Sequence, residues 1–179
     1  VEIGSLGNAI DFGDTTVAAR NDGGAFSSPT RGIIGGGHSP GILTRIDYVT
    51  ISSLGNAKDF GDLNRGRTRH GGCSNSVRGL WGGGDMGNND NFTSIEYITM
   101  ASAGNGTDFG NLTVARRQVK AASSQTRGVW GGGESPGYTN VLDYITIASA
   151  GNAEDFGDLA VGRANFATCS DSHGGLGGF

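Results

Sequence analysis

The chain has 179 residues, a formal net charge of −4 and 35 glycines. Both signs of charge are spread along it, so it lacks the basic stripe that holds a phosphate backbone, and we expect no nucleic-acid partner. No apolar run approaches the roughly 18 residues of a membrane span. The glycines do not follow the triplet period of collagen, so we expect one folded domain with many turns.

One unit recurs along the whole chain at a spacing of about 48 residues, which is typical of solenoids, propellers and other arrays. Its most constant part is a DFG triplet, with phenylalanines at Phe12, Phe60, Phe109 and Phe156. A glycine-rich run keeps step with it and starts at Arg31, Arg78 and Arg127. We expect a single domain over 1–179, with repeats at about 1–17 plus 163–179, 18–65, 66–114 and 115–162.

Taken in order, the chain predicts four short strands per unit. After the partial first unit, GGAFSS and RGIIGGG give two glycine-bounded strands, and the polar loop HSPGILT follows. RIDYVTIS then alternates as a half-buried strand does, and DFGD supplies the fourth. The same order returns twice, with RGLWGGG and SIEYITMAS, then with RGVWGGG and VLDYITIAS. Gly, Pro, Asn or Ser interrupts every helical stripe, so the fold class is all-β.

The chain starts and stops in the middle of a repeat, and the two partial repeats complement each other. VEIGS at the start aligns with ITIAS of the third complete unit, and the chain stops after HGGLGGF, a divergent fourth copy of the glycine-rich strand. An array that closes on itself buries its terminal edges, whereas an open solenoid needs polar caps, and the sequence shows none. We therefore expect four four-stranded blades, the last one closed by the N- and C-terminal strands, with Val1 beside Phe179.

The order of residues in each unit resembles the kelch repeat of β-propellers. The matching arginines before the first strand are Arg20, Arg67, Arg116 and Arg163. The glycine pairs that end the second strand begin at Gly36, Gly83 and Gly132, and the tyrosines of the third strand are Tyr48, Tyr97 and Tyr144. The kelch tryptophan of the fourth strand is absent, and the DFG phenylalanine is its nearest counterpart. The resemblance implies a four-bladed kelch-like β-propeller.

The sequence pattern GNAxDFGDL, together with YITIAS, also resembles repeats in tail-fibre and other virion proteins of phages that infect cyanobacteria. This resemblance implies a viral structural protein at a virion or other extracellular surface. It implies as partners a glycan or protein of a cell surface, other virion proteins or copies of the chain itself.

Several motifs imitate catalytic sites. DFG in a kinase holds magnesium, but four copies without an HRD triplet favour a tight turn, with the Phe packed between blades. The GGG runs lack the Lys-Ser or Lys-Thr of a phosphate loop and favour close backbone approach. Kelch-type sugar oxidases need a copper site with two His and a Tyr-Cys partnership, and the three histidines here fall at different places in their repeats. We expect no enzyme.

The repeat arginines, Arg20, Arg67, Arg116 and Arg163, need partners if they are buried. We expect a structural ring in which they pair with carboxylates of the DFGD runs. The candidates are Asp14, Asp62 and Asp158, or Asp11, Asp59, Asp108 and Asp155. An arginine-lined central site for an anion is the alternative.

No cofactor is expected. The loop Asp85–Asn91 has oxygen ligands that could wrap calcium, but it lacks the closing Glu of an EF-hand and favours a solvated loop. Cys73 and Cys169 are too few and too far apart for a disulfide framework or a zinc site, so we expect small buried strand residues.

The loops that follow GGG vary while the rest of the unit does not, and such loops usually bind the partners of propellers. We expect a non-catalytic module that recognises carbohydrate or a protein partner, with aromatic rings to stack on a sugar and polar groups to hold hydroxyls. The candidate ligand-binding residues are His38, Arg45, Asp85, Asn88, Asp90, Phe92, Glu134, Tyr138 and Asn140. A purely architectural subunit of a fibre or shell is the alternative, and a sugar-oxidising enzyme comes third.

Overall fold

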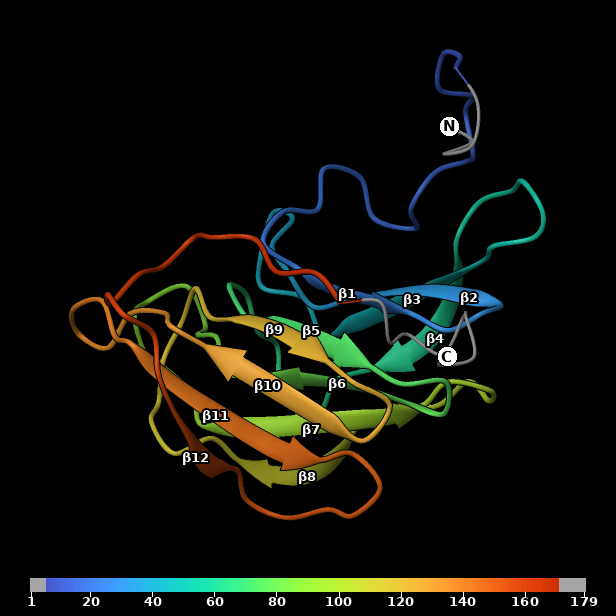
Figure 1. The fold of residues 1–179 in the computed structure, drawn as a ribbon. Coiled ribbons are helices and arrows are strands. Elements are labelled where there is room, and N and C mark those ends of the chain that lie inside the picture. The colour runs from blue at the N-terminus through green and yellow to red at the C-terminus, as the bar shows by residue number, and fades with distance from the viewer. Residues whose placement is uncertain (1–5, 171–179) are drawn as a thin grey trace.

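The computed structural model describes residues 6–170, which form three four-stranded antiparallel sheets and contain no helix (Figure 1). Each sheet is one sequence unit with its strands paired in chain order. The first contains β1 (Gly24–Ser27), β2 (Arg31–Gly35), β3 (Arg45–Thr50) and β4 (Lys58–Asp62). The second contains β5 (Gly71–Ser74), β6 (Arg78–Gly82), β7 (Ser94–Thr99) and β8 (Thr107–Asn111). The third contains β9 (Lys120–Ser123), β10 (Arg127–Gly131), β11 (Val141–Thr146) and β12 (Glu154–Asp158). The predicted all-β class is confirmed.

The DFG triplet forms a β-bulge in the outermost pair of strands. In the first sheet the register shifts so that Phe60 has no partner residue on β3. Its buried ring packs edge-on against Tyr48, with the ring centroids 5.9 Å apart. The Gly61 amide donates to the Asp59 carboxylate at 3.1 Å, within the bulge. The bulge and the Tyr–Phe pair recur in the other two sheets. The predicted tight turn is wrong, because the triplet lies inside the fourth strand of each sheet.

Tryptophans fill the space between neighbouring sheets. Trp81 on β6 is fully buried and donates its indole N–H to the carbonyl of Gly24, in the preceding sheet, at 2.9 Å. Trp130 on β10 is placed in the same way against the second sheet. A Cβ on Gly35 or Gly82 would lie 2.5 Å or 2.7 Å from the facing indole, so the glycine-rich strands permit this close packing.

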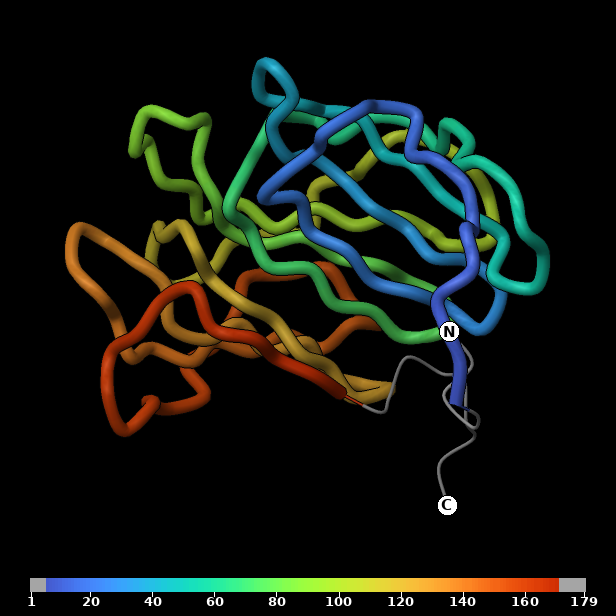
Figure 2. Tube along the Cα trace, turned by 90° about the horizontal axis from the view of Figure 1, so that it is seen from above, coloured from blue at the N-terminus to red at the C-terminus, as the bar shows by residue number. Residues whose placement is uncertain are grey.

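The first strands of the three sheets, β1, β5 and β9, lie next to one another, and their residues line a cavity of about 180 Å³. Thr168–Ser170 line the same cavity. Viewed from above, the units follow one another in chain order (Figure 2). Residues 6–170 form no fourth sheet, so the end-closed four-bladed propeller remains a prediction. The expected pairing of Val1 with Phe179 lies outside the described residues.

The two cysteines differ in their surroundings. Cys73 on β5 is buried as predicted, and burial raises the pKa of its thiol. Cys169 is exposed, so the prediction of a buried strand residue is wrong there. Residues 163–170 form no strand of a sheet in the described part of the chain, so no strand pairing buries the Cys169 side chain.

Candidate functional site

The loops that follow the glycine runs begin from a repeated base. In each unit the first loop residue forms an antiparallel bridge with the residue after the repeat arginine, in the pairs Asn21–His38, Thr68–Asp85 and Arg117–Glu134. The Gly37 amide also donates to the carbonyl of Arg67, in the next unit, at 2.8 Å. A Cβ on Gly36 would lie 2.6 Å from that oxygen. The variable loops therefore start from fixed backbone positions.

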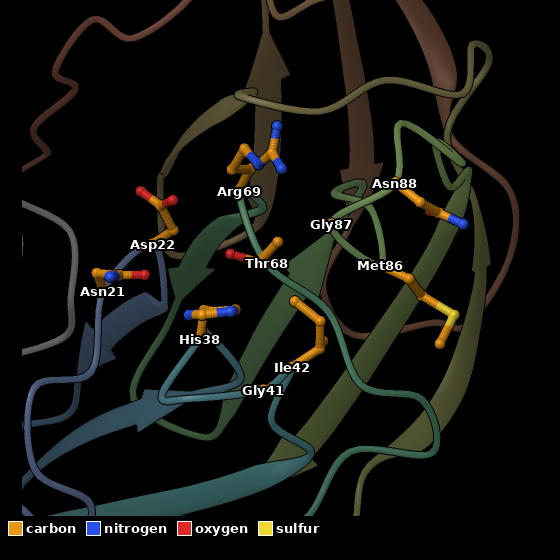
Figure 3. A pocket seen from close by; sticks show the side chains of 10 residues that line it. All are labelled: Asn21, Asp22, His38, Gly41, Ile42, Thr68, Arg69, Met86, Gly87 and Asn88. Atoms are coloured by element: carbon orange, nitrogen blue, oxygen red, sulfur yellow. The ribbon is translucent and has the colours of Figure 1, made fainter.

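The β2–β3 loop and the β6–β7 loop enclose a cleft of about 470 Å³, which we call the loop cleft (Figure 3). It is lined by Asn21, Asp22, His38, Gly41, Ile42, Thr68, Arg69, Met86, Gly87 and Asn88. In Figure 3 the residues of the first unit's linker and His38 stand on one side, and Met86 and Asn88 stand on the other. The loop cleft is thus built from two successive units.

Polar groups and a small apolar surface meet in the loop cleft. Asn21, Asp22, His38 and Asn88 are exposed, so amide, carboxylate and imidazole groups are open to a ligand. Met86 is 43% exposed and lies with Ile42 in the same lining. Such a lining suits a small ligand that carries several hydroxyl groups on an otherwise apolar frame.

The fully buried Asp85 anchors one wall of the loop cleft. Its carboxylate accepts a hydrogen bond from the Gly87 amide at 3.1 Å, and its other oxygen lies 3.5 Å from the Arg69 guanidinium and 3.8 Å from that of Arg117. Two cationic groups at this carboxylate oppose binding of calcium by the loop Asp85–Asn91. Across residues 6–170 no group of three His, Cys, Asp or Glu side chains is placed to hold a metal ion.

Only two of the predicted ligand-binding residues, His38 and Asn88, line the loop cleft. Arg45 and Glu134 are engaged in ion pairs, at 3.2 Å to Asp47 and 2.8 Å to Arg117. Asp90 is exposed and lies 3.5 Å from Arg65. Tyr138, at 70% exposure, and Asn140 stand on the β10–β11 loop, outside the loop cleft.

Phe92 does not stand on the surface, and its predicted stacking role is wrong. Its ring is 4% exposed, and the Arg65 guanidinium lies 3.8 Å from the ring centroid. The Phe92 amide donates to the carbonyl of Gly84 at 2.8 Å, which draws the end of the loop inward. Burial of the ring and its contact with a cation stabilise this position.

The repeat arginines pair with carboxylates other than those predicted. Arg20 contacts Asp47 at 2.8 Å, and Arg116 contacts Asp143 at 3.0 Å. Arg67 pairs with Glu96 in the same way. These acids stand in the third strand of each sheet, and all three are buried. Burial lowers the pKa of the Arg116 guanidinium, and the Asp143 carboxylate opposes that shift.

The ring with Asp11, Asp59, Asp108 and Asp155 is therefore a wrong assignment. These four aspartates are exposed, and in three of the four copies the carboxylate accepts a hydrogen bond from the DFG glycine. Arg163 donates to the carbonyl of Val161 at 3.4 Å and forms no ion pair among residues 6–170. The repeat arginines do not line the central cavity, so the alternative of an anion site there gains no support.

Sequence reasoning missed four residues that line the loop cleft. Asn21, Asp22, Thr68 and Arg69 follow the repeat arginines, in a linker that we treated as scaffold. The signal was present, because the third unit has Arg117 and Gln118 at these positions and the linker therefore varies as the loops do.

Neither a protein-family model nor a curated protein sequence matches the chain. The part of the chain that the structure describes contains no helix long and apolar enough to span a membrane. The assignment of function therefore rests on the geometry of the loop cleft and on the resemblance of the repeats.

Proposed function

We propose that the protein is a non-catalytic binding module that recognises a saccharide on a cell surface through the loop cleft. The observation that carries the proposal is the lining of the cleft, in which exposed amide, carboxylate and imidazole groups surround the apolar atoms of Ile42 and Met86. Sugar hydroxyls both donate and accept hydrogen bonds, so they fit Asn and Asp side chains, while the C–H face of the ring needs apolar contact.

The size and position of the cleft support the same proposal. A volume of about 470 Å³ lies within the range of roughly 300–1,000 Å³ that is usual for small-molecule sites. The loops around it differ between units, whereas the residues beneath them repeat. A change of loop sequence could therefore alter specificity without disturbing the sheets.

The likeness of the repeats to kelch and to phage tail-fibre sequences supports a more specific setting. In this proposal the three sheets are blades of a four-bladed propeller, and the terminal segments supply the fourth. The module is then a virion or other extracellular appendage that meets host carbohydrate or a host protein. In the alternative, a purely architectural subunit, the chain polymerises and has no saccharide affinity.

Binding of cell-surface polysaccharides and a glycan array to the purified chain tests the proposal. His38→Ala and Asn88→Ala remove exposed side chains of the loop cleft and should abolish binding. Tyr138→Ala is the matched control, because this exposed residue stands on another variable loop, and it should bind as the parent does. Absence of saccharide binding, or loss only in Tyr138→Ala, would contradict the proposed site. Sedimentation velocity of the same samples tests the architectural alternative.

A further inference from the structure

Successive units are joined along their outer edge by one contact that occurs three times, which we call the seam. The glycine of a Gly-Asn loop donates its amide to the DFG phenylalanine of the preceding unit, from Gly55 to Phe12 at 2.8 Å and from Gly151 to Phe109 at 2.7 Å. Two residues later a second amide donates, from Ala153 to the carbonyl of Asn111 at 2.8 Å.

An asparagine side chain completes each seam. The oxygens of Asn56, Asn105 and Asn152 accept a hydrogen bond from the backbone amide of the residue after the DFG glycine, at 3.0, 3.0 and 3.1 Å. The DFG glycine itself must lack a side chain, because a Cβ on Gly110 would lie 2.5 Å from the carbonyl carbon of Gly151. The DFG triplet of one unit and the Gly-Asn-Ala or Gly-Asn-Gly segment of the next unit thus form a matched pair of surfaces.

One copy of each surface is unoccupied within residues 6–170. At the outer edge of the third sheet, no atom would lie within 4 Å of a Cβ on Gly157, and Phe156 is 51% exposed, whereas Phe109 is 3% exposed. At the other end, Leu6 is fully exposed, and among residues 6–170 the amides of Gly7 and Ala9 donate no backbone hydrogen bond of the kind that Gly55 and Ala57 donate. In Figures 1 and 2 the start of the described chain stands away from β12, so the two surfaces are not joined in this structure.

We propose that the outer edge Glu154–Asp158 is a docking surface for the chain's own Leu6–Ala9 segment. This inference rests on the proposed ring of four units and is independent of saccharide binding. Leu6–Ala9 reads LGNA, the same sequence as Leu54–Ala57, which already occupies a seam. In the docked state the Gly7 amide donates to the Phe156 carbonyl, the Ala9 amide to that of Asp158, and the Asn8 side chain accepts from the Asp158 amide.

The pitch of the repeat favours docking within one molecule. In a complete unit, Gly55 binds the preceding unit while Phe60, five residues later, binds the following one. Phe12 already accepts the hydrogen bond from Gly55 of the first unit. Gly7 lies five residues before Phe12, as Gly55 lies five residues before Phe60, so Gly7 would form the seam that precedes the one at Phe12. Residues Thr168–Ser170 lie beside β9, where the Thr168 hydroxyl donates to the Ala121 carbonyl at 2.6 Å, and the proposed fourth unit would start there.

Cysteine cross-linking tests this docking. The test protein carries Asn8→Cys and Asp158→Cys with Cys169→Ser, and a short bis-maleimide reagent joins thiols that lie close together. Cys73 stays in place, because it is buried and burial raises its pKa. The matched control carries Asn152→Cys and Asn111→Cys, which sit at a seam that is formed. Both proteins should give an internally cross-linked monomer, identified by its mass and gel mobility.

Adding Gly157→Ala separates docking from mere proximity. A methyl group there should block the seam as it would at Gly110, so the cross-link between positions 8 and 158 should be lost, while Gly157→Ala added to the control pair should leave its cross-link intact. Failure of the 8–158 pair to react while the control reacts, a cross-link that survives Gly157→Ala, or cross-linked dimers in place of monomers would each overturn the proposal. Saccharide binding by Gly157→Ala should equal that of the parent, so the failure of either proposal can be told apart.

Discussion

Two glycines with nearly the same backbone angle measure what the seam contributes to stability. Gly110 has a φ of +148° and Gly55 has a φ of +147°, so alanine at either position incurs a similar conformational cost of about 1–3 kcal/mol. A Cβ on Gly55 would meet nothing within 4 Å. A Cβ on Gly110 would lie 2.5 Å from the carbonyl carbon of Gly151 and 2.9 Å from the amide nitrogen of Asn152, so the seam must open.

The extra cost of Gly110→Ala follows from the bonds that the seam contains. Two backbone hydrogen bonds, at 2.7 and 2.8 Å, and one from the Asn111 amide to the Asn152 side chain, at 3.1 Å, are strained or lost. At about 0.5–1.5 kcal/mol each, these three bonds add roughly 1.5–4.5 kcal/mol to the loss of unfolding free energy, beyond the loss in Gly55→Ala. Urea unfolding of both variants measures the difference. Equal losses would refute the view that the DFG glycine is required by the neighbouring unit.

Two further predictions concern buried charge and pH. Asp143→Asn leaves the buried Arg116 without its carboxylate and should lower the unfolding free energy by about 3–5 kcal/mol, whereas Asp90→Asn, in an exposed pair 3.5 Å from Arg65, should lower it by at most about 1 kcal/mol. Equal effects in urea unfolding would contradict the buried pairing. Burial lowers the pKa of His70 from 6.5 to about 3. Below pH 6.5 the imidazole is therefore protonated in the unfolded chain, whereas in the folded protein it stays neutral until the pH falls to about 3. Its contribution to stability is therefore complete above pH 6.5 and is lost as the pH falls towards 3, by about 2 kcal/mol at pH 5. The difference in unfolding free energy between pH 7 and pH 5 should shrink in His70→Gln, and an unchanged difference would contradict the burial of the neutral imidazole.

Repetition made the strands predictable from sequence, and it showed that the DFG triplet is structural, although the triplet forms a bulge and not the expected turn. A triplet that returns in every unit cannot be explained by a single catalytic site, and Phe60 and Phe109 are indeed buried at bulges. The partner of the arginine was not predictable in the same way, because each unit carries acids in two places. Strand register decides between them: Asp47 lies at the buried centre of its sheet, and Asp59 lies on its exposed edge.

The loop cleft was predictable only in part. A variable loop after GGG identified His38 and Asn88, but Asn21, Asp22, Thr68 and Arg69 come from linkers that precede the strands of each sheet. Phe92 shows a second limit, because an aromatic residue in a polar loop has the same sequence context whether it is exposed or folded under an arginine. Burial by the neighbouring Arg65 depends on tertiary contact and leaves no periodic signal.

The loops meet differently at the two junctions between the described units. Between the first and second units, the two loops approach each other at Ile42 and Gly87 and leave the space lined by His38 and Met86. Between the second and third units, the Asn91 side chain donates to the carbonyl of Glu134 at 3.2 Å, and the Asn89 side chain accepts from Arg117. These contacts bridge the second junction. The same backbone bridge thus supports each variable loop, and the side chains of the loop determine whether it borders a cleft or bonds to the neighbouring loop.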